Sequence, residues 1–190
     1  MPSGLFSPSV RPVFASTIAV LAWIVGFQIF PGLKLEVFAR VTAMLAALFL
    51  GGSAARTDTG WMLPHVSVPC VVTTDCSAAD YTLLAAALIA WRAARSGRHI
   101  GMAVLLGSAF SGPFAIGVNA LRVTVVTQAH RWAIPLAPES YGHFLHLLIG
   151  AAVFLPCLIA LNALLHAYER HARSPQPDPA PAPAANSAVS

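Results

Sequence analysis

Residues 13–30 form an unbroken run of eighteen side chains without a charge, and this run limits the fold more than any other feature. An α-helix rises about 1.5 Å per residue, so about twenty apolar residues cross the ~30 Å hydrocarbon core of a bilayer. Similar apolar stretches follow at residues 37–54, 77–94, 100–127 and 143–168. The sequence therefore predicts an all-α fold, a polytopic membrane helix bundle with about five transmembrane helices.

The composition excludes several other classes of protein. Hydrophobic residues make up 57% of the chain and charged residues only 9%, whereas soluble domains carry about 25% charged residues. The net charge of +4 comes from a shortage of acids and not from a basic patch with aromatics, so we expect no nucleic-acid partner. Three scattered cysteines do not make a disulfide framework or a paired metal site, and we expect no metal and no cofactor.

The distribution of basic residues predicts an orientation. If the loop that holds Arg92, Arg95 and Arg98 is cytoplasmic, seven basic residues fall inside and three outside. This predicts an extracytoplasmic N-terminus and a cytoplasmic C-terminus. We expect residues 1–12 to be an extracytoplasmic leader and residues 13–173 to be the transmembrane domain. Residues 174–190, rich in Pro and Ala, are expected to form a disordered cytoplasmic tail.

This topology brings three reactive side chains to one membrane face. Cys76 opens the third apolar stretch, Arg122 lies about five residues from the outer end of the fourth, and His146 lies one turn into the fifth. A thiol at a helix N-terminus beside a cation is favoured as a thiolate nucleophile. A guanidinium stays protonated and suits an oxyanion or a carboxylate. The sequence thus predicts a one-sided site near the outer membrane surface.

Two further residues support this site, and other interpretations stay open. Asn119 shares a polar helix face with Arg122, and His143 shares a face with His146. Arg122 could instead extend to the headgroups, and the imidazoles could be ordinary interior residues. The thiol of Cys76 could be merely buried, or it could pair with Cys70 in a disulfide. A metal site of two imidazoles and a thiol lacks any familiar ligand spacing.

Three short motifs resemble those of the exosortase/archaeosortase family of membrane transpeptidases. They are Cys76-Ser77-Ala78, the N-x-x-R-V pattern of residues 119–123, and the H-x-x-x-G-x-x-x-F pattern of residues 146–154. The short chain is similar to the compact, exosortase K-like branch. The family often has Gly two residues after the Cys, where this chain has Ala78, which restricts the backbone there.

The resemblance implies a function and roles for the residues. Cys76 would be the nucleophile, His146 the general acid/base, and Arg122 the group that stabilises the oxyanion. Residues 13–173 would then be a catalytic domain in the bacterial cytoplasmic (inner) membrane, with its site on the extracytoplasmic face. It would cleave a C-terminal sorting signal from exported proteins through a thioacyl intermediate and transfer them to an acceptor. Two alternatives remain: a small transporter or channel subunit that binds an anionic substrate at Arg122, and a non-enzymatic membrane assembly factor.

Overall fold

The computed structural model describes residues 9–64, 66, 70–76, 78–132 and 142–173. Most of the predicted leader and the whole predicted tail therefore lie outside the described residues. The same holds for the side chains of a few helical residues, among them His143 and His146.

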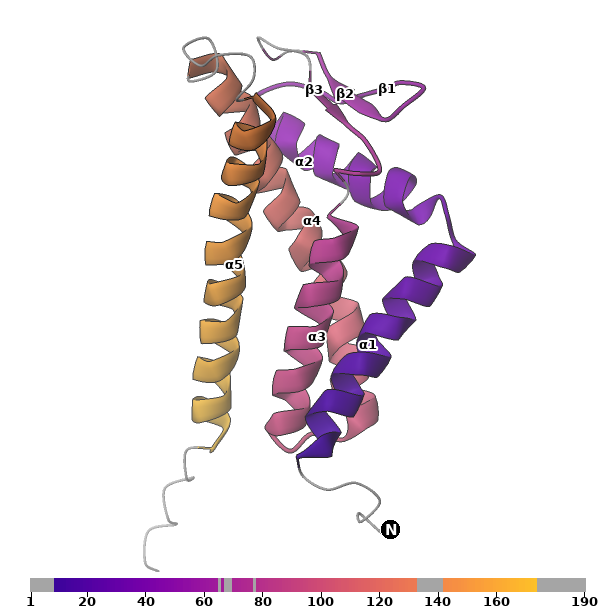
Figure 1. The fold of residues 1–190 in the computed structure, drawn as a ribbon, viewed down its shortest axis with the longest axis vertical. Helices are drawn as coiled ribbons and strands as arrows, with labels where there is room; N and C mark the ends of the chain where they lie inside the picture. Colours follow the sequence, from indigo (N-terminus) through magenta and orange to yellow (C-terminus); the bar gives the residue numbers. More distant parts are fainter. Residues whose placement is uncertain (1–8, 65, 67–69, 77, 133–141, 174–190) are drawn as a thin grey trace, which may run out of the picture.

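Four helices run along the long axis of the molecule: α1 (Val10–Ile29), α3 (Ala79–Arg95), α4 (Ile100–Trp132) and α5 (Gly142–Arg173) (Figure 1). Three described segments are long and apolar enough to span a membrane, namely Val10–Ile29, Ile100–Ala129 and Leu147–His171. The prediction of a helical bundle with membrane-spanning helices is confirmed to this extent.

Small side chains hold α1, α3 and α4 together. Alanines from all three helices form one buried cluster, and Gly107 of α4 lies against α3. A Cβ built on Gly107 would lie 2.9 Å from both the carbonyl oxygen of Ala86 and the Cβ of Ala90. Close backbone approach of this kind is how helices associate where no hydrophobic effect drives them together.

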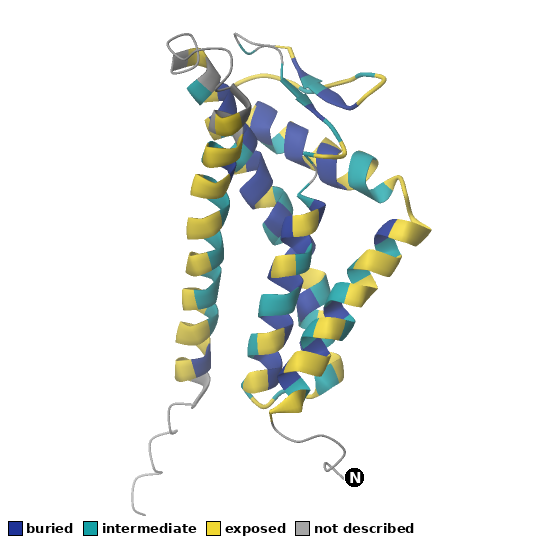
Figure 2. Ribbon diagram, in the orientation of Figure 1, coloured by how far each residue is buried: buried dark blue, intermediate teal, exposed yellow. Residues whose placement is uncertain are grey.

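A helix and a small sheet cover one end of the bundle. The π-helix η1 (Leu33–Ala39) leads into α2 (Arg40–Phe49), and the strands β1 (Ala55–Arg56), β2 (Trp61–Leu63) and β3 (Cys70–Val72) pair antiparallel in that order. Alanines of α2 pack against β2, β3 and Val123 of α4. Figure 2 shows this buried contact as the dark face of α2, whereas much of α5 is exposed. The sheet corrects the expectation of an all-α fold.

The predicted second span, residues 37–54, is not among the described segments that are long and apolar enough to span a membrane. The helical segment from Leu33 ends at Phe49, and Gly51 follows in a left-handed conformation with φ +73°. The segment includes Lys34, Glu36 and Arg40, and it lies across the bundle end instead of running down it (Figure 1). An apolar window cannot distinguish such a helix from a spanning one, because its alanine face is buried by the sheet and α4.

This change also moves the N-terminus. Without a crossing at α2, four helices alternate in direction, so Val10 and the last turn of α5 lie at the same end of the bundle (Figure 1). The sequence predicted opposite ends. Lys34, Arg40 and Arg56 consequently lie at the end that carries the sheet, and Arg11 lies at the end with the α3–α4 turn.

The backbone just before α3 is strained at Ala78. This residue has φ +58° and ψ +23°, a left-handed conformation that a Cβ disfavours. We expect Ala78→Gly to raise the free energy of unfolding by about 0.5–1 kcal/mol, because glycine removes this strain. Thermal or denaturant unfolding in detergent micelles measures the change. Ala85→Gly, inside the same helix, is the matched control and should lower stability; equal effects of both variants would contradict the prediction.

Candidate active site

Cys76 lies in the turn between β3 and α3, and a buried asparagine fixes its backbone. The Cys76 N–H donates to the carbonyl oxygen of Thr73 at 3.1 Å, which closes the turn. The Asn119 amide nitrogen donates to the carbonyl oxygen of Cys76, and it lies 3.5 Å from the hydroxyl of Thr42. Asn119 and Thr42 are both fully buried. One side chain thus ties the cysteine turn to α4 and α2.

The structure brings Cys76 and Arg122 to one small cavity. This cavity measures about 60 Å³ and lies where the sheet meets α4; its lining comprises Cys70, Val71, Val72, Cys76, Arg122, Val123 and Val126. Val72 and Val123 also belong to the core beneath the sheet. A thiol and a guanidinium therefore share a largely apolar surrounding, in which charges interact more strongly than in water.

Residues of α5 hold the guanidinium of Arg122 in place. Its Cζ atom lies 5.3 Å from the centroid of the Phe154 ring, a cation–π contact. The Phe154 ring in turn stacks on Tyr81 of α3, with centroids 4.5 Å apart. Gly150 leaves the necessary space, because a Cβ built there would lie 3.0 Å from Arg122 Nε. Gly150 and Phe154, known from the sequence only through the resemblance, thus both contact Arg122.

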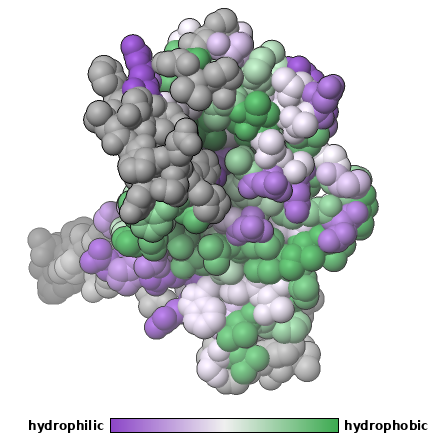
Figure 3. All heavy atoms as spheres, turned by 45° about the horizontal axis from the view of Figure 1, so that its top comes forward, coloured by the Kyte–Doolittle hydropathy of each residue, from purple (hydrophilic) through white to green (hydrophobic). Residues whose placement is uncertain are grey.

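A second and more polar cavity opens beside Arg122. It measures about 190 Å³, and its lining includes Lys34, Asp75, Asp80 and Arg122. Figure 3 shows this end of the molecule, where hydrophilic side chains lie over the sheet and helix ends and border hydrophobic ones. Sequence reasoning expected Lys34 and Arg122 on opposite sides of the membrane, whereas in the structure both line this cavity. Arg122 therefore stands between an apolar cavity with two thiols and a polar cavity with charges of both signs.

The smaller cavity is lined by two thiols, and the burial of Cys70 bears on which of them could act as a nucleophile. Cys70 and Cys76 are both free, so the open alternative of a disulfide between them is not the state that this structure has. Burial raises the pKa of the Cys70 thiol, and a hydrogen bond with Thr127 and the charge of Arg122 offset part of that rise. This rise disfavours the thiolate of Cys70, which is the reactive form, so Cys70 is a poor candidate nucleophile. Cys76 remains the nucleophile predicted from the sequence.

The depth that the sequence predicted for the site was wrong in detail. α4 continues to Trp132, so Arg122 lies ten residues before its end and not about five. α3 begins at Ala79, so Cys76 precedes the helix and does not open it. The residues still meet because β3 and the Cys76 turn lie against α4 near Val123 and Val126.

The two histidines of the predicted site are described only in part. His143 and His146 belong to the first two turns of α5, and their side chains lie outside the described residues. Their distances to Cys76 are therefore not part of the observed geometry. The structure brings together Cys76, Asn119 and Arg122.

A polar cluster that sequence reasoning missed lies at the other end of the bundle. Arg92 of α3 donates from Nε and Nη2 to Asn162 Oδ1 of α5, at 3.0 and 2.7 Å. Its Nη1 lies 3.5 Å from the carboxylate of Glu169, which is only 9% exposed. The sequence shows Arg92 near the end of one apolar stretch and Glu169 just after another. It does not show that they pair, because that depends on how α3 and α5 face each other.

Gly150 offers a test of the site that does not alter any polar group. We expect Gly150→Ala to displace the Arg122 guanidinium. The rate of the peptide cleavage proposed below should then fall about tenfold or more, since small misplacements at reacting groups are costly. A Cβ on Gly117 of α4 meets nothing within 4 Å, so Gly117→Ala should keep full activity and gain about 1 kcal/mol of stability. Cleavage rates and unfolding midpoints of both variants test these expectations. A cleavage rate of Gly150→Ala equal to that of the wild type would contradict the role of Gly150.

Together the fold and the site define a helical bundle with segments long and apolar enough to span a membrane, and a small sheet at one end covers a cavity lined by thiols and Arg122. No protein-family model matches this chain, and no curated protein or solved structure is similar to it. The resemblance to the exosortase/archaeosortase family accordingly stays a prediction based on its three motifs.

Proposed function

We propose that this protein is a membrane-embedded cysteine peptidase or transpeptidase of the exosortase type. The observation that supports this best is the shared cavity of Cys76 and Arg122, with Asn119 fixing the Cys76 backbone. A nucleophile in the turn before α3 and a cation on α4 that contacts α5 are the parts that acyl transfer requires.

In the proposed reaction, the Cys76 thiolate attacks a peptide carbonyl and forms a tetrahedral oxyanion. The guanidinium of Arg122 stabilises this oxyanion, and the low dielectric of the cavity strengthens the interaction. The intermediate collapses when the leaving amine takes a proton, which releases the C-terminal part of the substrate and leaves a thioacyl enzyme. A second nucleophile, the acceptor, then attacks the thioester and frees Cys76.

We assign the proton transfers to His146. It precedes Gly150 by four residues and Phe154 by eight, so the three positions share one face of α5. Gly150 and Phe154 both contact Arg122, which indicates that this face turns toward the site. His143, one turn closer to the helix start, shares that face and is proposed to support His146, as Asn119 supports Cys76.

We propose a corrected membrane orientation with both ends of the described chain in the cytoplasm. Six basic residues lie toward the end with the α3–α4 turn: Arg11, Arg92, Arg95, Arg98, Arg170 and Arg173. Four lie toward the end with the sheet: Lys34, Arg40, Arg56 and Arg131. The excess favours the α3–α4 turn as the cytoplasmic side. The site then faces the extracytoplasmic side of the inner membrane, where exported substrates arrive.

The substrates would be exported proteins whose C-terminal sorting signal includes a hydrophobic helix. Insertion of that helix beside the bundle would align its outer end with the site, so the bilayer itself would provide proximity. Mass analysis of the C-termini of exported proteins, in cells with and without the gene, tests this. We expect at least one protein to keep an uncleaved hydrophobic C-terminus without the gene. Identical C-termini in both strains would contradict the proposal.

One observation favours a second candidate, a transporter or channel subunit. Polar residues occur at both ends of the bundle, because Arg92, Asn162 and Glu169 form a buried cluster far from Cys76. Such intramembrane charges often mark a transport path. Glu169→Gln distinguishes the two candidates: it should abolish transport, whereas the cleavage reaction at the opposite end should continue.

A further inference from the structure

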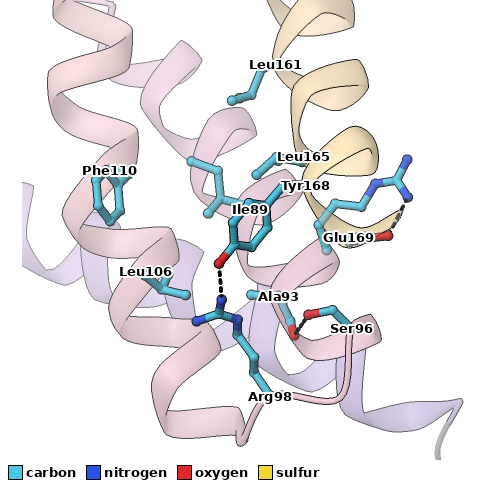
Figure 4. A pocket seen from close by; sticks show the side chains of 11 residues that line it. Ile89, Ala93, Ser96, Arg98, Leu106, Phe110, Leu161, Leu165, Tyr168 and Glu169 are labelled. Carbon is cyan, nitrogen blue, oxygen red and sulfur yellow. Dashed lines mark hydrogen bonds and ion pairs between the residues drawn. The ribbon is translucent and has the colours of Figure 1, made fainter. Parts of the chain in front are cut away.

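A cavity lined by described residues lies at the end opposite Cys76. It measures about 410 Å³ and lies between α3, α4 and α5 (Figure 4). Most of its wall is apolar and comes from all three helices: Ile89, Leu106, Phe110, Leu161 and Leu165. Phe110 is 60% exposed, so the apolar part of the cavity is open sideways, toward the surface that the bilayer would cover.

One end of this cavity is polar and carries a net positive charge. Arg98 Nη2 donates to the Tyr168 hydroxyl at 3.0 Å, and the Arg98 guanidinium lies over the Tyr168 ring (Figure 4). The carboxylate of Glu169 also lines the cavity, but Arg92 neutralises it. Two guanidinium groups against one carboxylate leave a charge of +1 in the lining.

The guanidinium of Arg98 has capacity for a further ligand. It has five N–H donors, and the hydrogen bond to Tyr168 uses one of them. The ring of Tyr168 orients its plane at the mouth of the cavity, as a stacked arginine that binds phosphate is often oriented. An apolar cavity that ends at an arginine fits an amphiphile with a hydrocarbon chain and an anionic head.

We propose that this cavity binds an anionic phospholipid. One acyl chain lies along the apolar wall formed by Leu106, Phe110 and Leu161, and the phosphate pairs with Arg98. Basic pockets between membrane helices on the cytoplasmic side select anionic headgroups in this way. The inference rests on the membrane placement proposed above and not on the peptidase chemistry. The bound lipid would fill the space between α5 and the other helices of the bundle.

The test is native mass spectrometry of the purified full-length chain in detergent micelles, with either phosphatidylglycerol or phosphatidylcholine added. We expect phosphatidylglycerol to bind about fivefold more tightly or better. Arg98→Gln should remove this preference and Arg98→Lys should keep most of it. The matched control is Arg56→Gln, which removes one charge at the opposite end, where Arg56 pairs with Glu36 at 2.8 Å. It should leave the preference unchanged.

Leu161→Trp provides a variant that does not alter charge. A larger side chain in the apolar wall should weaken the binding of both lipids severalfold. Equal binding of the two lipids by the wild type would overturn the proposal. So would a full preference in Arg98→Gln, or an equal loss in Arg56→Gln. Because no readout uses peptide cleavage, failure here would leave the proposed function untouched, and failure of the peptidase proposal would leave the lipid site untouched.

Discussion

Cys76→Ala is expected to abolish processing, with a loss of at least about 10³-fold in the rate of cleavage. Burial raises the pKa of Cys70, the other thiol of this cavity, which makes it a poor substitute, and removal of a covalent nucleophile has effects of this size. The substitution removes one sulfur atom from a half-buried turn residue, so the fold should persist. Mass analysis of substrate C-termini in cells that carry the variant measures the loss.

Two other cysteines provide matched controls for this prediction. Cys70 lines the same cavity, and Cys157 packs near Tyr81 and Phe154 of the α3–α5 contact. Cys70→Ala and Cys157→Ala remove the same atom type from the same chain, and each should keep cleavage within a fewfold of the wild type. If Cys76→Ala retained activity while Cys70→Ala lost it, the nucleophile would be Cys70 and the assignment would be wrong.

Arg122→Gln is expected to lower kcat by about 10²–10³-fold while the protein stays folded. The guanidinium is the candidate oxyanion donor, and removal of one such donor typically has this effect. Glutamine keeps an amide N–H donor, but it is two bonds shorter than arginine and carries no charge. Stability should not fall greatly, because the substitution also removes a charge from within a candidate spanning segment. Cleavage rates of purified protein, together with its unfolding midpoint, separate these two effects.

Arg40→Gln is the control for the loss of charge at this end of the molecule. Arg40 lies over the ring of Trp61, is exposed, and does not line either cavity beside Arg122. It should cleave normally. Equal losses in both variants would show that the positive charge of the whole surface, and not the placement of one guanidinium, is what matters.

Much of the fold could be predicted from the sequence because lipid imposes a simple rule on the chain. Uncharged runs long enough to span the bilayer must become helices, since only these satisfy every backbone group internally. Three of the predicted runs are indeed helices long and apolar enough to span a membrane: Val10–Ile29, Ile100–Ala129 and Leu147–His171. The run at residues 37–54 is similarly apolar apart from Arg40, yet it lies across the bundle end. Its alanine face is covered by the sheet and α4, and composition alone does not reveal whether protein or lipid covers an apolar face.

The site could be predicted in part, because its residue types are unusual in an apolar chain. Cys76, Asn119 and Arg122 stood out as polar or reactive groups beside long apolar stretches, and the structure brings them together. Lys34 was expected far from Arg122, because its predicted position depended on a helix that runs the length of the bundle, whereas that segment lies across the bundle end. The contact of Gly150 with Arg122 is a matter of helix packing, which no spacing within one helix specifies.

The proposed mechanism requires the His146 imidazole to lie near the Cys76 thiol. The most direct test replaces His146 with Cys in a chain whose Cys70 and Cys157 are Ala, and then applies a short bifunctional thiol reagent. We predict an intramolecular cross-link between position 146 and Cys76. Phe144→Cys, at a position 59% exposed on the same helix, should not cross-link. A cross-link at position 144 but none at position 146 would contradict the account.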